Sequence, residues 1–388
     1  MDFALTAEQR LFADTIARFA RDYLAGGALD RAHEPAYPFD VARLMAAQGL
    51  LGITVPATHG GQGGTLMDAV LAIEQVALVC PRSADVVQAG NFSAIRTLAE
   101  YASPDQRQRF LPDLLSGRKL IALGMSEPEA GSAVTELRTT ATPDGTGYRI
   151  NGSKVFTSNS PDATLFLIYV RFGPGLRGIG SVLVERGRPG FTLGKPTRFH
   201  SGDDWCQLYF EDCRIEAADV LLGPGGFKKQ IAGFNVERIG NAARSLALGR
   251  HAFNLARGYA GQRRQFGRAI CEFQGIQWKF AEMRMQLDAA QLLLYRAAVN
   301  ADAGLPDATE TSIAKAFCNR AGHDAASEAV QIMGAAGFSE SALAEYCLRR
   351  TRGWMIAGGS IEILKNRIAE DVFGRAFPQR MQDARTAE

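Results

Sequence analysis

The sequence predicts an α+β fold in three parts: an N-terminal α-helical domain over 1–120, a middle β-barrel or sandwich domain over 121–226, and a C-terminal four-helix bundle over 227–388. Its 388 residues, 46% of them hydrophobic, are enough to bury a large core and to divide into several domains. Apolar residues recur at helical spacing near both ends of the chain, whereas short apolar runs between Gly, Pro and Asp turns fill the middle.

The N-terminal part is predicted to be helical from Thr6 to about Leu120. Thr6 and Gln9 have the spacing of a capping box, which opens a helix, and the segment from Ser103 to Gln106 repeats that signal with Pro104 at the first helical position. The glycine-rich run HGGQGG at 59–64 predicts a loop between helices.

The middle part contains strand-like runs, among them 148–150, 164–170 and 180–184. No helical segment intervenes between them, so crossover connections of the βαβ type are not expected. This pattern favours a barrel or sandwich and disfavours a nicotinamide-binding Rossmann domain.

The C-terminal part regains the helical period after 226 and keeps it to about residue 375, with breaks near 303–306 and 334–341. Its clearest apolar stripe, which predicts the core of a helix bundle, consists of Met283, Leu287, Ala290, Leu294 and Ala297.

Composition argues against several partners. The formal charge of +2 provides no strong field for nucleic acid or an anionic membrane, so we expect neither. The six cysteines and five histidines lack metal-type spacing, so we expect no metal site and buried free thiols. The first residues show neither a basic segment nor a long apolar run, which favours a cytoplasmic protein without an export signal.

The octapeptide MSEPEAGS at 125–132 combines hydroxyl groups, a proline-fixed turn and small residues whose backbone N–H groups can approach a flavin and its pyrophosphate. Taken alone it could also be an ordinary surface turn. With INGSKVFTSN at 150–159 it resembles the acyl-CoA dehydrogenase family, and the resemblance covers nearly the whole chain. It implies an FAD-dependent oxidoreductase acting on a CH–CH bond, with flavin contacts from Met125, Ser126, Ser132, Phe156 and Ser158.

Further FAD contacts are implied by segments nearer the C-terminus. QRRQFGRAICEFQ at 262–274 is similar to the family segment that reaches the FAD of a neighbouring subunit, and QIMGAAGF at 331–338 is similar to a turn at the pyrophosphate, with Ala335 replacing a glycine. Without the resemblance, the arginine run would be an ordinary solvated helix face. The resemblance implies a homotetramer, or a homodimer, and these contact residues: Arg263, Gln274, Gln331, Gly334, Ala335, Ser360 and Glu362.

The catalytic base is expected at an unusual position. The family's commoner C-terminal glutamate is replaced by Gly358 in IAGGS at 356–360, whereas FNVER at 234–238 resembles the helix that supplies the base in the isovaleryl-CoA and long-chain branches. The resemblance therefore implies that Glu237 removes the α-proton of an acyl thioester while a hydride passes from Cβ to flavin N5. Burial should raise the pKa of Glu237, and the Gly358 N–H should bind the thioester oxygen.

The substrate remains open within the acyl thioesters. Substrate contacts are expected from Ser132, Asn235, Arg238 and Ala357, and the small residues at 357 and 358 leave space for a branched or bulky acyl group. Because Asn235 departs from the family pattern, the carrier is either CoA or an acyl or peptidyl carrier protein. The resemblance implies electron-transfer flavoprotein as electron acceptor.

Other functions are consistent with parts of the sequence. IAGGS and EFQGIQW at 272–278 also resemble the sulfinopropionyl-CoA desulfinase, although that branch has Gln in place of Glu237 and Arg near the position of Asp85. A flavin-binding protein that has lost catalysis is a further alternative, suggested by Gly358. A separate alternative for residues 237–238 is an ordinary Glu-Arg surface pair on a helix.

Overall fold

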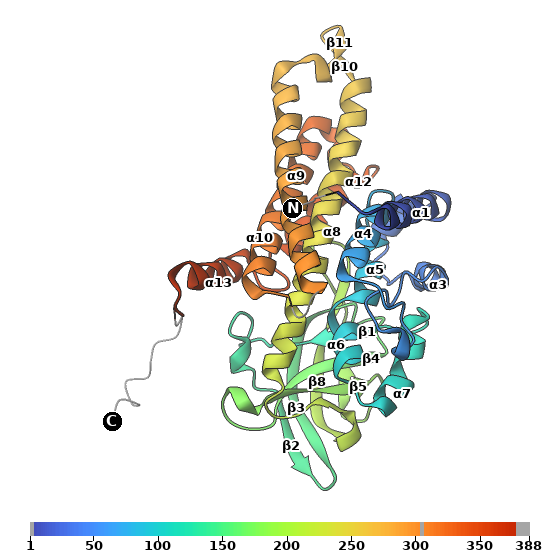
Figure 1. The fold of residues 1–388 in the computed structure, drawn as a ribbon. Helices are drawn as coiled ribbons and strands as arrows, with labels where there is room; N and C mark the ends of the chain where they lie inside the picture. The colour runs from blue at the N-terminus through green and yellow to red at the C-terminus, as the bar shows by residue number, and fades with distance from the viewer. Residues whose placement is uncertain (1–3, 303–305, 378–388) are drawn as a thin grey trace.

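The computed structural model describes residues 4–302 and 306–377 and contains helical parts at both ends of the chain with a β-sheet between them (Figure 1). The break predicted near 303–306 falls largely on residues outside the described ranges. The six cysteines are free thiols, and all except Cys271 are buried. Among the described residues, no helix has the length and apolarity needed to cross a lipid bilayer.

The N-terminal helices begin where the capping signals predict. The Thr6 and Ser103 hydroxyls accept hydrogen bonds from the backbone N–H groups of Gln9 (3.1 Å) and Gln106 (3.2 Å), which satisfies donors that a helix start leaves free. Of the 59–64 segment, His59 ends a 3-10 turn at Ala57–His59 and residues 60–64 form a loop. The helices are α1 (Ala7–Leu24), α2 (Ala28–His33), α3 (Phe39–Ala47), α4 (Leu66–Ala77), α5 (Ala84–Asn91), α6 (Ser93–Tyr101) and α7 (Pro104–Leu115).

The middle part forms, within the described residues, a nine-stranded sheet in the order β6-β8-β3-β2-β4-β5-β9, with β1 beside β4 and β7 beside β8. Most neighbours are antiparallel, but β1 and β2 each pair with β4 in parallel. The strands are β1 (Ile121–Gly124), β2 (Thr140–Asp144), β3 (Gly147–Ser158), β4 (Leu165–Arg171), β5 (Ile179–Glu185), β6 (Phe191–Leu193), β7 (Thr197–Arg198), β8 (Asp204–Glu216) and β9 (Val220–Leu222).

Strand β4 is buried on both faces, which explains why it reads as a continuous apolar run. Phe166 and Ile168 pack into a core with β3 and β8, whereas Leu165 and Leu167 pack against α6 and α7. Because alternate side chains of a strand point to opposite faces, one face of β4 packs against helices α6 and α7, and the other face packs against side chains of β3 and β8.

The C-terminal part is a bundle of long helices. Helices α8 and α9 form a long hairpin closed by β10 and β11, α10 packs against both, and α12 packs against α8 and α10. The predicted stripe on α9 is buried. The elements are α8 (Phe227–Gln262), β10 (Arg264–Gln265), β11 (Arg268–Ala269), α9 (Gln274–Asp302), α10 (Ala308–Met333), α11 (Ala335–Phe338), α12 (Leu343–Trp354) and α13 (Ile361–Phe373).

Helix α4 joins the two helical parts. It packs against α8 and α9, and its Val70 and Ile73 share one apolar cluster with Val236 and Ile239 of α8 and Leu294 of α9. The N-terminal helices and the bundle therefore share a core, and α5 also contacts α8.

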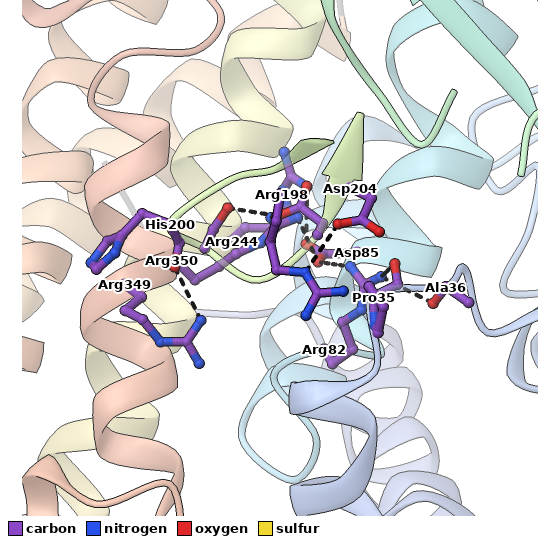
Figure 2. Close-up of polar contacts among 12 residues, drawn as sticks. Pro35, Ala36, Arg82, Asp85, Arg198, His200, Asp204, Arg244, Arg349 and Arg350 are labelled. Carbon is purple, nitrogen blue, oxygen red and sulfur yellow. Dashed lines mark hydrogen bonds and ion pairs between the residues drawn. The ribbon is translucent and has the colours of Figure 1, made fainter. Parts of the chain in front are cut away.

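Buried ion pairs connect all three parts (Figure 2). The Asp85 carboxylate of α5 accepts hydrogen bonds from Arg82 (3.1 Å), from Arg244 of α8 (3.0 Å) and from Arg350 of α12 (2.7 Å). Arg350 also donates to Asp203, in the loop between β7 and β8. Burial alone would raise the pKa values of the two aspartates, but the neighbouring arginines hold both below their ordinary range.

Candidate active site

The segment 125–132 follows β1 and lies against β3, so the two predicted flavin motifs are adjacent. The Val155 N–H donates to the Ser126 carbonyl (2.9 Å), and the ammonium group of Lys154 donates to the Met125 carbonyl (3.2 Å) and the Glu127 carboxylate (2.7 Å). Both charged side chains are buried. This ion pair holds the two motifs together.

Glu127 is further fixed by backbone donors. Its carboxylate accepts hydrogen bonds from the N–H groups of Arg138 (2.5 Å) and Thr139 (2.9 Å). Burial opposes ionisation of Glu127, yet Lys154 and these hydrogen bonds outweigh it and lower its pKa, whereas burial lowers the pKa of Lys154 to about 8. The resemblance assigns no role to Glu127 or Lys154, although their opposite charges inside the two motifs are a usable signal.

Replacing Lys154 with methionine should lower the free energy of unfolding by about 3 kcal/mol, because Glu127 would remain buried without its cation. Urea denaturation measures the change. Lys195→Met removes an exposed lysine of the same part of the chain and should cost less than about 0.5 kcal/mol. Equal effects of the two substitutions would show that the buried pair adds nothing.

An aromatic surface lies beside these motifs. Phe156 has a left-handed backbone (φ +56°) at a register irregularity between β3 and β8, and its side chain is 60% exposed. The rings of Phe199 and Trp205 lie 6.3 and 4.7 Å from it, centroid to centroid. Ser158, two residues along the strand, is also exposed. Phe199 and Trp205 could not be predicted as part of this surface, because neither belongs to a motif.

Glu237 lies on α8 and faces α5. Its carboxylate accepts a hydrogen bond from the Gln88 carboxamide (2.8 Å), and its side chain is half-buried, which leaves it accessible to a bound molecule. Removal from water raises the pKa of Glu237 to about 7, although Arg244, Gln88 and Lys315 oppose that rise. A carboxylate with this pKa is suited to take up a proton near neutrality.

Gly358 lies in the turn between α12 and α13. Gly358 and Gly359 both have left-handed backbones (φ +74° and +89°), and a Cβ at 358 would lie 3.4 Å from the Lys315 side chain and 3.7 Å from Asn241, one turn beyond Glu237 on α8. Within the described residues, no protein acceptor receives the Gly358 N–H. That donor is therefore open to a ligand.

Lys315 of α10 fixes this turn from the protein interior. Its buried ammonium group donates to the carbonyls of Trp354 (3.1 Å) and Gly359 (2.9 Å), and the Asn319 amide also donates to Trp354 (2.6 Å). Burial, reinforced by the nearby cations Arg238 and Arg244 and opposed by Glu237, lowers the pKa of Lys315 to about 7. Glu237 and the turn at 358 thus share Lys315 as a neighbour.

Predicted contacts around this turn lie close to Glu237 and Gly358 in the chain. Asn235 is buried and accepts a hydrogen bond from Arg238 (2.9 Å), and Ala357 is exposed. Ser360 caps α13 by accepting from the Ile363 N–H (3.5 Å), and Glu362 follows it in the first turn. Ser132 is exposed in the segment after β1.

The remaining predicted contacts lie elsewhere. Arg263 and Gln274 are exposed at the tip of the α8–α9 hairpin, beside β10 and β11, at the end of the bundle farthest from the sheet (Figure 1). Gln331, Gly334 and Ala335 are exposed where α10 ends and α11 begins. A single chain therefore does not bring Arg263 and Gln274 to the flavin motifs.

Three family models match the chain: "Acyl-CoA dehydrogenase, N-terminal domain" over 6–118, the middle domain over 122–213 and the C-terminal domain over 224–373. The short-chain-specific acyl-CoA dehydrogenase of Clostridium acetobutylicum is 31% identical, over 96% of this chain and 100% of that protein. The 3-sulfinopropanoyl-CoA desulfinase of Paraburkholderia xenovorans is 31% identical, over 97% of this chain and 99% of that protein.

Solved structures agree with this pattern. Butyryl-CoA dehydrogenase from Megasphaera elsdenii superposes with a TM-score of 0.90 at 30% identity, covering 96% of this chain and all of that one. The FAD complex of PigA gives 0.90 at 26% identity, with 96% and 99% covered. The prolyl acyl carrier protein oxidase AnaB gives 0.90 at 26% identity, with 95% and 100% covered.

Proposed function

The chain belongs to the acyl-CoA dehydrogenase family, and from this we propose that it is an FAD-dependent oxidoreductase that converts an acyl thioester to its α,β-unsaturated form. FAD, when bound, supplies at N5 the acceptor for the hydride that leaves Cβ. The chain's own residues bind and orient the substrate, remove the α-proton and stabilise the charge that develops on the thioester oxygen.

The middle part fits a flavin. Phe156 presents an exposed ring beside Phe199 and Trp205, and an aromatic face can stack on a flat heteroaromatic ring. The Lys154–Glu127 pair holds the Met125 and Ser126 backbone against the strand that carries Phe156 and Ser158. We assign flavin contacts to Met125, Ser126, Ser132, Phe156 and Ser158.

The observation that carries the proposal is Glu237, an accessible carboxylate whose pKa is raised to about 7. A base with this pKa is deprotonated often enough at neutral pH to accept a proton and is still basic enough to hold it. Gly358 and Glu237 both lie near Lys315. The open Gly358 N–H can donate a hydrogen bond to the thioester oxygen as negative charge develops there. Asn235, Arg238 and Ala357 adjoin this site and are assigned to substrate binding.

Assembly would complete the cofactor site. The exposed residues Trp278, Met285, Leu292 and Val299 recur every seven residues along α9, and Phe266 at the hairpin tip is 94% exposed. Such a stripe is typical of a helix that packs against another helix. We infer a homodimer or homotetramer in which residues of one copy approach the FAD of a neighbouring copy: Arg263, Gln274, Gln331, Gly334 and Ala335. Ser360 and Glu362 are assigned to FAD contacts beside Gly358.

Two assignments follow from the relatives' names alone. Neighbours include an electron transferring flavoprotein and a carrier protein oxidase, which supports electron-transfer flavoprotein as acceptor and either CoA or a carrier protein as the thioester carrier. The six free cysteines suit a reducing compartment, and on that ground we propose a cytoplasmic location.

Anaerobic titration of the flavin-loaded protein with CoA-linked and carrier-linked thioesters tests the proposal. The correct substrate should bleach the flavin absorbance and yield an enoyl thioester. Sulfite release from a sulfinopropionyl thioester without net bleaching would instead indicate a desulfinase. A yellow protein that reacts with no thioester would be a flavin-binding protein without this activity.

A further inference from the structure

We propose that Gln88 is the positioning residue for Glu237: its carboxamide holds the carboxylate in place, and the glycine at 240 exists to admit that carboxamide. The inference rests on the proposed function, because it concerns the base of that reaction. It assigns a role to α5, which no sequence motif connects with the base.

The contact is partly buried and spans two parts of the chain. Gln88 is 3% exposed and donates from Nε2 to Glu237 Oε2 at 2.8 Å, from α5 to α8. A carboxylate oxygen can only accept, so the amide N–H must face it. One donor on one oxygen limits the rotation of the carboxylate and leaves its other oxygen available for the substrate.

Gly240 lies one helical turn beyond Glu237 and forms the floor under the carboxamide. A Cβ at 240 would lie 2.1 Å from Gln88 Oε1, 2.7 Å from its Cδ and 2.8 Å from its Nε2, and van der Waals contacts between heavy atoms require about 3.5 Å. Any side chain at 240 would therefore displace the carboxamide. By contrast, Gly258 on the same helix is exposed and has no heavy atom within 4 Å of its Cβ position.

The geometry carries a cost that a purely structural contact would avoid. Gln88 Oε1 is buried against Gly240 without a hydrogen-bond partner, and glycine inside a helix is less favourable than alanine by roughly 1 kcal/mol. An apolar side chain at 88 would contact α8 without leaving a buried polar atom unpaired. Both features are explained if the amide is needed at Glu237.

The hydrogen bond also favours the ionised form of the base. Gln88 shares that effect with the cations facing Glu237, which are Arg244 on α8 and Lys315 on α10. Arg238 lies near Lys315, and Asp85 of α5 reaches this group through its ion pair with Arg244. A substitution at 88 removes none of these charged groups, and Lys315, whose pKa is also about 7, is present in every variant, so a difference between variants reports the contribution of the amide.

The test uses Gln88→Met, Gly240→Ala and, as control, Gly258→Ala. In the first two variants the pKa of Glu237 should rise by about one, because a hydrogen bond to the charged form is lost, and flavin reduction at high pH should slow about tenfold through misorientation. Gly258→Ala should leave both unchanged. Stopped-flow flavin reduction against pH gives the rates.

An infrared pH titration reads the same pKa without any activity. The band of the protonated carboxyl group is assigned by its loss in Glu237→Gln. If the pKa of Glu237 is unchanged in Gln88→Met and the rates are those of the unmodified protein, the positioning role is overturned while the proposed function stands. If that pKa is raised but no thioester reacts with the unmodified protein, the contact is supported and the proposed function is overturned. Because Gln88→Met keeps a side chain of similar length and leaves Gly240 unchanged, it remains informative if Gly240→Ala does not fold.

Discussion

Glu237→Gln should slow flavin reduction by a thioester about a thousandfold or more, while FAD binding and stability stay close to those of the unmodified protein. General-base catalysis contributes factors of about 10²–10⁴, and a glutamine cannot accept the α-proton. The substitution keeps the shape of the side chain, and its amide can still pair with Gln88, so the contact between α5 and α8 survives. The loss should therefore appear in the chemical step.

Anaerobic stopped-flow absorbance measures this step directly. Glu211→Gln, on an exposed position of β8, is the matched control and should retain the full rate. In the unmodified protein the rate should rise as the pH increases through about 7, because burial raises the pKa of Glu237 to that value and only the deprotonated form accepts a proton. A variant that keeps both the rate and its pH dependence would place the base at another residue.

The parts of the fold that depend on local periodicity could be predicted from the sequence. The stripe from Met283 to Ala297 predicted a bundle core, and it is buried. The parallel pairing of β1 with β4 could not be predicted, because its residues, such as Ile121 and Leu165, are far apart in the chain and carry no mutual signal. Hydrophobic patterns indicate that a segment is buried, but they do not identify its partner.

The candidate site shows the same division. Glu237 was reached through a motif, and Lys154 and Glu127 lay inside motifs whose charged residues were not interpreted. Gln88 was missed because it is 149 positions from Glu237 and sits in a helix with no distinguishing pattern. A polar contact between distant helices depends on how those helices pack, and one chain's sequence does not encode that packing in any local repeat.

The ion pairs around Asp85 are the other feature that no motif predicted, and Arg350 is their central residue. It pairs with Asp85 (2.7 Å) and with Asp203, and it lies over the Trp354 ring at 5.3 Å. Arg350→Met fills similar space but leaves both aspartates without this cation. Breaking a buried pair from one side costs about 3–5 kcal/mol, so the free energy of unfolding should fall by that amount at pH 7.

Urea denaturation at several pH values tests this, with Arg352→Met, an exposed position of the same helix, as the control that should change stability by less than about 0.5 kcal/mol. The pKa of Asp203 is held well below its ordinary range, since Arg350 outweighs the opposing effect of burial. The ionised form of Asp203 therefore stabilises the unmodified protein at pH values above the ordinary carboxyl pKa of about 3.9. This contribution is lost as the pH falls below that value toward the lowered pKa of the folded state.

In Arg350→Met the same carboxyl group is buried without its main cation, so its pKa should move upward and protonation should relieve the penalty as the pH falls. The stability difference between the two proteins should be largest near neutral pH and should shrink toward pH 4. A difference that is independent of pH would mean that Arg350 acts through packing against Trp354 alone. A difference below about 1 kcal/mol at pH 7 would mean that Arg82 and Arg244 suffice to hold the three parts of the chain together.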